Sequence, residues 1–245
     1  FIFFMEEFSY NENVASKLLD GFNDYNLKSH QFVFLFNKLL DNKKNIFKAI
    51  DEFKPDGIII AYSYTKKIEI NLNNLKLSKI LLNCYSNNFN GLTILPDDYN
   101  GAKKAVNYLF QNNLTKIPII LSSDTWMKGY KDRLSGWRDA HTENNIDYKD
   151  SFIVQPKSNL ENGGYLETKK LFKKNKKIDA IFCTSDEIAM GSYQAIKEVG
   201  LKIPKDISII GFDNSRISEL VKPKLTTVQL PYSEMTQKAI KHIID

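Results

Sequence analysis

The segment from residue 179 to residue 214 constrains the fold of this chain most strongly. It contains a short apolar run (DAIFC), an amphipathic stretch (EIAMGSYQAIKEV) that ends before Gly200, and a second apolar run (ISIIGFD). The two apolar runs are typical of buried strands, and the stretch between them is typical of a helix. Ligands of such parallel units bind outside the carboxyl ends of the strands. We therefore expect residues 184–186 and 212–214 to face one crevice.

The same alternation of strands and helices runs along the rest of the chain. Apolar runs predict strands at residues 2–5, 31–36, 57–63, 79–85, 117–121 and 152–154. Helical periodicity predicts helices at residues 13–26, 45–53, 100–111, 133–144 and 162–172. Regular alternation of this kind favours the α/β class, with parallel strands and with helices on both faces of the sheet.

Two segments of the chain resemble each other. Residues 54–63 (KPDGIIIAYS) and 177–186 (KIDAIFCTSD) share a lysine, an aspartate, a small residue, an apolar run and a polar end. They are either the same strand in two similar lobes or a chance match of a short pattern, and the residues leave both open. With 245 residues, 42% of them hydrophobic, the chain is long enough for one large domain or for two lobes with separate cores.

The formal net charge of +5 comes from lysines that are mostly dispersed among Asn and Glu. Only residues 169–177 (KKLFKKNKK) form a dense cluster, which we expect to be a solvated face rather than a phosphate-binding patch. No apolar run approaches the roughly 20 residues of a membrane span, so no membrane partner is expected. Cys84 and Cys183 stand far apart in apolar strands, which predicts buried thiols in a reducing compartment.

The residues that usually carry chemistry form no catalytic or metal-binding pattern in this sequence. His30, His141 and His242 lie in unrelated segments, and the sequence has no GxSxG, HExxH or glycine-rich phosphate motif. The adjacent Asp97 and Asp98 are expected to point to different sides of a turn, which is unsuitable for an acid–base pair. We therefore expect a binding protein rather than an enzyme, with neither a cofactor nor a metal ion.

The last third of the chain carries a family resemblance. The run SDEIAMGSYQAIKEVGLKIPKDISIIGFDNS, followed by PKLTTVQLP, resembles the effector-binding core of the LacI/GalR family of bacterial transcription regulators. Residues 97–101 (DDYNG) and 133–140 (RLSGWRDA) agree with the same family. The resemblance covers nearly the whole chain and is strongest from residue 133 to residue 231. PKLTTV is its most specific part, because related periplasmic sugar-binding proteins share the strand-end aspartates but generally lack this segment.

The resemblance implies a type I periplasmic-binding-protein-like fold, in which crossover strands join two doubly wound α/β lobes with parallel sheets and a ligand binds between them. It places residues 1–113 and 229–245 in the N-terminal lobe and residues 114–228 in the C-terminal lobe. It also implies a cytoplasmic homodimer that binds operator DNA only through a helix-turn-helix head upstream of residue 1. Because the chain begins with Phe1 and stops within an expected helix, we expect that head and the final family strands to lie outside this sequence.

The resemblance also implies a small-molecule effector, a sugar, sugar phosphate or similar metabolite, and assigns its main contacts. Asp213 follows Phe212 at the end of a buried strand, where its carboxylate can accept hydrogen bonds from two ligand hydroxyls; capping of the next turn is the alternative. Arg133 matches the arginine of the family's RxxGW segment, and its planar fork can donate two hydrogen bonds to ligand oxygens. We expect Arg133, Phe212 and Asp213 to line the ligand site.

Two further polar residues are expected to contact the ligand, each with a structural alternative. Ser185 stands where relatives often have Asn, so it is expected to contact the ligand. The structural alternative is a capping box, with Thr184 as the N-cap and Glu187 three residues later. Asp186 is expected to orient this loop rather than to touch ligand. Asn100 precedes or begins a helix in the family's polar turn, so it is either a ligand contact or a capping residue.

Tyr10, Tyr62 and Trp126 can provide the apolar faces against which sugar rings or purines pack, or they pack within the protein instead. Relatives often have Asn-Pro and aromatic residues in the first loop, whereas this chain has ENVA at residues 12–15, so its ligand is expected to differ accordingly. Two other functions stay open. One is an extracytoplasmic solute-binding protein of a sugar transporter, and the other is a regulator that responds to a partner protein.

Overall fold

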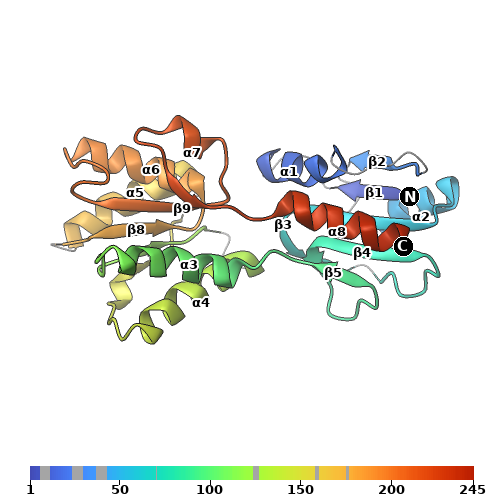
Figure 1. Ribbon diagram of the computed structural model, residues 1–245, viewed down its shortest axis with the longest axis horizontal. Coiled ribbons are helices and arrows are strands. Elements are labelled where there is room, and N and C mark those ends of the chain that lie inside the picture. The colour runs from blue at the N-terminus through green and yellow to red at the C-terminus, as the bar shows by residue number, and fades with distance from the viewer. Residues whose placement is uncertain are drawn as a thin grey trace. The chain divides into compact units, whose positions relative to one another are not determined.

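Two parallel five-stranded sheets organise the part of the chain that the computed structural model describes, namely residues 1–5, 12–23, 30–36, 43–69, 71–123, 127–157, 160–174 and 177–245. Each sheet belongs to its own compact unit (Figure 1). Unit 1 comprises Phe1–Pro96 and Pro231–Asp245, and unit 2 comprises Asp97–Leu230. The predicted α/β class with two doubly wound parallel sheets is confirmed.

The sheet of unit 1 has the strand order β2-β1-β3-β4-β5, and every neighbouring pair is parallel. Its strands are β1 (Ile2–Met5), β2 (Val33–Phe36), β3 (Gly57–Lys67), β4 (Ser78–Tyr85) and β5 (Leu92–Ile94). The helices of this unit are α1 (Glu12–Asn23), α2 (Lys43–Phe53) and α8 (Tyr232–Ile244).

Different helices cover the two faces of this first sheet. Ile2 and Phe4 of β1 belong to the same apolar cluster as Ile46 of α2. Phe3 points to the other face, where its ring meets that of Phe22 in α1 edge to face, with 4.9 Å between the ring centroids. Alternate side chains of a strand point to opposite faces, so β1 is apolar throughout because both of its faces are covered. Helix α8 packs beside α1.

The sheet of unit 2 has the strand order β10-β9-β8-β6-β7, again with parallel neighbours. Its strands are β6 (Ile119–Ile120), β7 (Ile153–Val154), β8 (Ala180–Cys183), β9 (Ser208–Phe212) and β10 (Thr226–Val228). Its helices are α3 (Asp98–Gln111), α4 (Lys128–Glu143), α5 (Leu160–Lys174), α6 (Asp186–Glu198) and α7 (Ile217–Leu220), with a 3-10 turn at Asp150–Phe152.

Helices pack in pairs on the two faces of this second sheet, α3 with α4 and α5 with α6 (Figure 1). Glycine permits the close approach in each pair. A Cβ atom at Gly136 of α4 would lie 2.2 Å from the carbonyl oxygen of Tyr99 in α3, and one at Gly191 of α6 would lie 1.8 Å from that of Glu161 in α5. Neither site has room for a side chain, so both glycines are required by packing.

Both sheets follow the same strand order when their strands are numbered along the chain, namely 2-1-3-4-5. Strands β3 and β8 are each the third strand in that order, and they lie in the two similar segments 54–63 and 177–186. Those segments are therefore the same strand in two similar units. Sheets of this order bind ligands at the carboxyl ends of the first and third strands, where the order reverses. In unit 2 those strands are β6 and β8.

The division into units differs from the expected lobe boundaries. The first break lies between residues 96 and 97 rather than after residue 113, because α3 packs against α4 and thus belongs to unit 2. The second break, between residues 230 and 231, falls close to the expected one. Both cysteines are buried free thiols, as expected. Within the described residues, no helix is long and apolar enough to cross a membrane.

Candidate functional site

A buried polar cluster lies at the carboxyl ends of β8 and β9 in unit 2. Its centre is Arg133, on the second turn of α4, and its other members come from the start of α3 and from the residues that follow the two strands. The polypeptide thus brings together three segments that are far apart in sequence. This edge of the sheet includes the reversal of strand order between β6 and β8, the place where such sheets bind ligands.

The guanidinium of Arg133 donates hydrogen bonds to all three of these segments. Its Nε atom donates to Oδ1 of Asp98 over 2.7 Å, and its Nη2 atom donates to Oδ1 of Asp213 over 3.2 Å. Its Nη1 atom donates to the carbonyl oxygen of Thr184. The side chain is 8% exposed, so these are charge-assisted bonds in a largely desolvated position. They fix the plane and the direction of the fork.

Two aromatic rings support the same guanidinium. The Cζ atom of Arg133 lies 3.9 Å from the ring centroid of Phe212 and 5.2 Å from that of Tyr130. A cation over an aromatic face is attracted by the ring's quadrupole, and the attraction is larger where water is excluded. Phe212 is fully buried, so its ring packs against the arginine instead of presenting an open face to a ligand.

Asp98 is the second acidic partner of Arg133 and is almost completely buried. Burial raises the pKa of its carboxyl group, although the nearby Arg133 opposes this change. Its neighbour Asp97 has a different task, because its carboxylate accepts a hydrogen bond from the backbone N–H of Asn100 and caps α3. The two aspartates therefore point in different directions, as expected, and do not form an acid–base pair.

Asp213 combines a buried carboxylate with an unusual backbone. Its φ angle is +100°, a region that non-glycine residues rarely adopt, and the next residue, Asn214, also has a positive φ of 48°. The backbone N–H of Asp213 donates to the carbonyl oxygen of Val228, which ties the turn to β10. Backbone strain of this kind persists where the surroundings enforce it and is concentrated at functional sites. The turn thus aims the Asp213 carboxylate at Arg133.

Asp186 stabilises the turn at Asp213 through hydrogen bonds to the residues around it. Its Oδ2 atom accepts a hydrogen bond from the backbone N–H of Ser215, and its Oδ1 atom accepts one from the hydroxyl of Thr227, both over 2.6 Å. The approach needs a glycine on β9, because a Cβ at Gly211 would lie 2.4 Å from Asp186 Oδ1. Burial raises the pKa of Asp186 to about 6 despite these hydrogen bonds. Asp186 was expected to orient its own loop, residues 184–186, but its carboxylate instead binds the turn after β9 and strand β10.

The predicted capping box at the start of α6 is wrong by one residue. Ser185, not Thr184, is the N-cap, and its hydroxyl accepts a hydrogen bond from the backbone N–H of Ile188. The Thr184 hydroxyl instead donates to the carbonyl oxygen of Ile120 and joins the ends of β6 and β8. Ser185 is also almost completely buried. Its contact with a ligand stays a prediction.

The remaining predicted contacts lie in different surroundings. Asn100 is exposed on the first turn of α3, where its Nδ2 atom donates to Oδ2 of Asp97, so its side chain takes part in the cap. Tyr62 is 1% exposed within the apolar core of unit 1, which corresponds to the packing alternative. Tyr10 and Trp126 lie outside the described residues. Arg133, Phe212 and Asp213 are thus the predicted residues that the structure brings together.

Sequence reasoning did not single out Asn83, a fully buried polar residue near the carboxyl end of β4. Its φ angle is +54°, its Nδ2 atom donates to the carbonyl oxygen of Tyr62, and its Oδ1 atom accepts from the hydroxyl of Thr65. Because β4 and β9 are each the fourth strand of their sheets, Asn83 is the topological counterpart of Asp213. In the sequence, Asn83 could have been noticed as the polar residue that interrupts the apolar run KILLNCY.

Comparison with known families identifies the chain. A family model described as a periplasmic binding protein-like domain matches residues 106–245, more than half of the sequence. The chain belongs to the periplasmic-binding-protein-like family. The match includes Arg133, Ser185 and Asp213, and therefore most of the polar cluster of unit 2. Within the described residues of this periplasmic-binding-protein-like chain, no group of three or more His, Cys, Asp or Glu side chains is placed to hold a metal ion.

Relatives of this periplasmic-binding-protein-like chain are transcription regulators. The regulator DegA of Bacillus subtilis is 37% identical over 58% of this chain and 41% of its own length. The ribose operon repressor of Haemophilus influenzae is 30% identical over 69% of this chain and 51% of its own length. The chain thus spans less than two thirds of these curated relatives.

A solved structure extends the likeness to the whole chain. A LacI family regulator from Enterococcus faecium, with bound ribose, has a TM-score of 0.76 and 26% identity, covering 100% of this chain and 90% of that one. These comparisons place the periplasmic-binding-protein-like chain with the effector-binding cores of the LacI/GalR regulators, as its last third predicts.

Proposed function

We propose that this chain senses a neutral, sugar-like metabolite for a transcription regulator. The observation that carries the proposal is the buried pair of Arg133 and Asp213 at the carboxyl ends of the strands of unit 2. One partner donates hydrogen bonds and the other accepts them, and vicinal hydroxyl groups do both. A sugar therefore matches the pair without needing a net charge of its own.

The contacts of the pair support a site that is formed before the ligand arrives. Asp98, Thr184 and the rings of Tyr130 and Phe212 hold the Arg133 fork. The strained turn at Asp213 is held by bonds to β10. A preformed site loses little conformational entropy when a ligand binds, so weakly interacting hydroxyl groups suffice for useful affinity.

The charges of the cluster favour a neutral ligand over a sugar phosphate. The cluster contains three buried carboxylates, those of Asp98 and Asp213, which pair with Arg133, and that of Asp186, which interacts with Asp213. Burial is the main cause of the raised pKa values of Asp98 and Asp186, and the negative charge of Asp213 adds to it in both cases. A phosphate group would bring a further charge of about −1.5 to −2 to these carboxylates. Neutral hydroxyl groups add no such electrostatic repulsion.

The comparisons support the same ligand class. One relative is a ribose operon repressor, and one similar regulator holds ribose. They also favour a regulator over the transporter-associated binding protein considered above, because these relatives are named as regulators. A regulator of this kind acts in the cytoplasm as a homodimer, and its helix-turn-helix head binds operator DNA. Ligand would act by its differential affinity for two conformations, and about 1–3 kcal/mol of coupling is enough for regulation.

A thermal-shift screen tests the proposal. The panel pairs neutral sugars with their phosphates, such as ribose with ribose 5-phosphate and glucose with glucose 6-phosphate, and adds purines. A ligand at a hundredfold excess over its dissociation constant adds about 2.7 kcal/mol, which corresponds to a rise of about 5–10 °C for a protein of this size. We expect such a rise for a neutral sugar. Asp213→Asn should abolish it, whereas Lys103→Ala, which removes a surface ion pair between α3 and α4, should not.

Two other outcomes have distinct meanings. A sugar phosphate that binds while its neutral partner does not would overturn the ligand class and leave the sensing function in place. Binding of no member of the panel would count against the sensing of metabolites altogether and would favour a regulator that responds to a partner protein.

A further inference from the structure

Unit 2 has a hollow at the edge of its sheet opposite to the Arg133 cluster. It has a volume of about 440 Å³ and is lined by Lys116, Asp147, Tyr148, Lys149, Phe152, Lys174 and Lys177. Small-molecule sites commonly have volumes of about 300–1,000 Å³, so the hollow is large enough for a metabolite. Lys116 precedes β6, Lys149 precedes β7 and Lys177 precedes β8, which places the hollow at the amino ends of these parallel strands.

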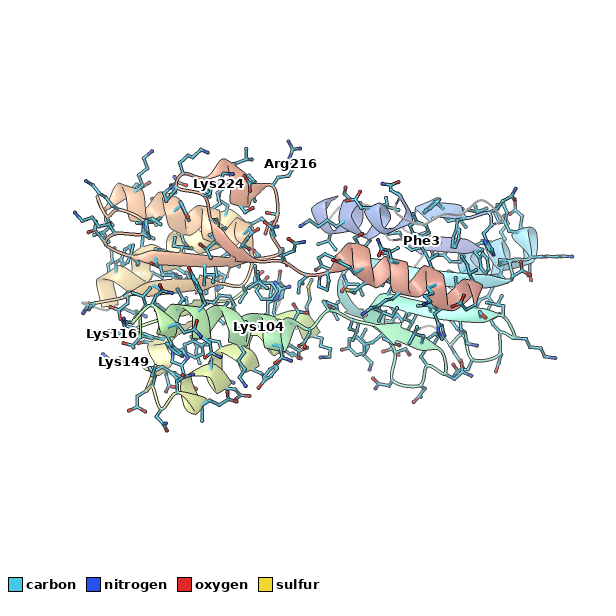
Figure 2. All side chains as sticks on the ribbon, in the orientation of Figure 1. Phe3, Lys104, Lys116, Lys149, Arg216 and Lys224 are labelled. Carbon is cyan, nitrogen blue, oxygen red and sulfur yellow. The ribbon has the colours of Figure 1, made fainter. Side chains whose placement is uncertain are left out.

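Four lysines line this hollow and only one acidic residue, Asp147, does so among the described residues. Three of the lysines come from separate connections of the chain and the fourth, Lys174, comes from the last turn of α5. Figure 2 shows Lys116 and Lys149 at the same end of unit 2. Neither of these two forms an ion pair with any described residue, and both are exposed. Like charges gathered with few counter-charges repel each other, and a bound anion relieves that repulsion.

The structure divides the lysine cluster that the sequence shows at residues 169–177. Lys169 forms an ion pair with Glu198, and Lys170 forms one with Glu167, so these two belong to the solvated face that we expected. Lys174 turns to the hollow instead, in the last turn of α5, where the helix dipole favours a cation. The helix dipole explains why a lysine is found at position 174. It does not explain Lys116 or Lys149, which lie in connections between elements.

The floor of the hollow is held firmly. The Tyr148 ring packs against the rings of Trp137 and His141, with centroids 4.5 Å and 5.2 Å away. The carboxylate of Asp179 accepts hydrogen bonds from the backbone N–H of Lys116 over 2.9 Å, which fixes this connection to the start of β8. Its other oxygen lies 3.9 Å from Nζ of Lys177, a long contact for an ion pair. The backbone that carries the lysines is thus ordered by buried and charged neighbours.

We propose that this hollow binds the phosphoryl group of a small phosphorylated metabolite. Four ammonium groups supply the donors and the charge, and the half-buried Tyr148 ring offers a face for the body of the ligand. The site is independent of the Arg133 cluster, which lies at the opposite edge of the same sheet and is rich in carboxylates. The chain then responds to two classes of compound, a neutral one at the carboxyl edge and an anionic one at the amino edge.

Isothermal titration of the whole chain with inorganic phosphate and with pyrophosphate, at constant ionic strength, tests the proposal. We expect saturable binding that is tighter for pyrophosphate. Lys116→Gln and Lys149→Gln should each weaken it by about two- to fivefold, the range of single exposed charge pairs, and the double variant should weaken it further. Lys104→Gln removes the same charge from α3 of the same unit (Figure 2) and should leave binding unchanged.

Several results would overturn the site. One is binding that does not saturate, and another is an equal loss in the Lys104→Gln variant, since both indicate a general effect of net charge. Tighter binding of a DNA duplex than of pyrophosphate, lost in the Lys116 and Lys149 variants, would assign the surface to nucleic acid instead. Asp213→Asn serves as the opposite control, because it should remove sugar binding and leave pyrophosphate binding intact.

Discussion

The Nη2 atom of Arg133 lies 3.2 Å from Oδ1 of Asp213, although the two residues are 80 positions apart in the sequence. The pair joins α4 to the end of β9, and Asp98 completes it from α3. Folding must therefore bring three separate segments together before the charges are compensated. The cluster is at once a structural junction of unit 2 and its candidate ligand site, and mutations in it should affect both stability and binding.

Replacement of Arg133 by alanine should destabilise unit 2 by about 3–5 kcal/mol, because it leaves the buried carboxylates of Asp98 and Asp213 without their cation. Urea unfolding followed by tryptophan fluorescence measures this, since Trp137 is buried in unit 2. The double variant with Asp98→Asn should recover part of the loss. A midpoint equal to that of the unchanged protein would show that the cluster contributes no stability.

At Asp213, glycine should be tolerated better than alanine. Both substitutions remove the carboxylate, but only glycine adopts a φ of +100° without steric cost. We expect Asp213→Gly to be more stable than Asp213→Ala by about 1 kcal/mol and both to lose sugar binding. Thermal unfolding of the two variants, with and without the sugar, separates backbone strain from ligand contact. Equal stability would mean that the turn changes conformation when the aspartate is removed.

Asp186 should make unit 2 more stable as the pH falls. Its folded pKa of about 6 lies above the ordinary value of 3.8, so the folded protein binds this proton more tightly than the unfolded chain does. Its contribution grows as the pH falls through 6 and is lost as the pH rises through 6. Between pH 7.5 and pH 5 the gain from this group is about 1.4 kcal/mol. Asp98, whose pKa is also raised, acts in the same direction.

Comparison with Asp186→Asn isolates this effect from the other carboxyl groups. Asp97, Glu198 and Glu219 have lowered pKa values and oppose it, but they are present in both proteins. The free energy of unfolding of the unchanged protein, minus that of the variant, should increase from pH 7.5 to pH 5 in urea titrations. A difference that stays constant over this range would show that Asp186 keeps an ordinary pKa.

Gly191→Ala should separate α5 from α6 and cost about 3 kcal/mol, because the new Cβ would lie 1.8 Å from the carbonyl oxygen of Glu161. Gly200→Ala is the matched control. It has a positive φ of 77° but no atom within 4 Å of the new Cβ, so it should cost only about 1 kcal/mol from backbone strain. Urea unfolding monitored by tryptophan fluorescence compares the two. Similar costs would show that the helix pair moves apart easily.

Most of the fold was predictable because each strand and helix carries its own pattern. The runs IFFM, GIIIAYS and DAIFC are apolar because the strands are covered on both faces, and periodicity marks the helices between them. Boundaries were less predictable. Helix α4 begins at Lys128 rather than at Arg133, and β5, β10 and α7 have three or four residues each, too few to show a pattern. The first unit boundary depended on the packing of α3, which no local pattern reveals.

The candidate site was predictable only where a residue type has a strong preference. Asp213 was predicted as an aspartate at the end of a buried strand and Arg133 as the arginine of a family segment. The structure pairs the two. Asp98 was not recognised as their partner, because 35 residues separate it from Arg133 and nothing local links them. Ser185 and Thr184 are adjacent and both are common N-cap residues, so the sequence alone did not show which of them caps α6.

The two units differ in how the chain supplies them. Unit 2 is one continuous segment, Asp97–Leu230, whereas unit 1 also needs α8, which follows unit 2 in the sequence, to cover its sheet beside α1. During synthesis, which proceeds from the N-terminus, every residue of unit 2 is available before α8 has been made. The Arg133 cluster can therefore assemble on the ribosome while unit 1 still exposes an apolar face. Protection of that face from aggregation therefore depends on α8, which is made after unit 2.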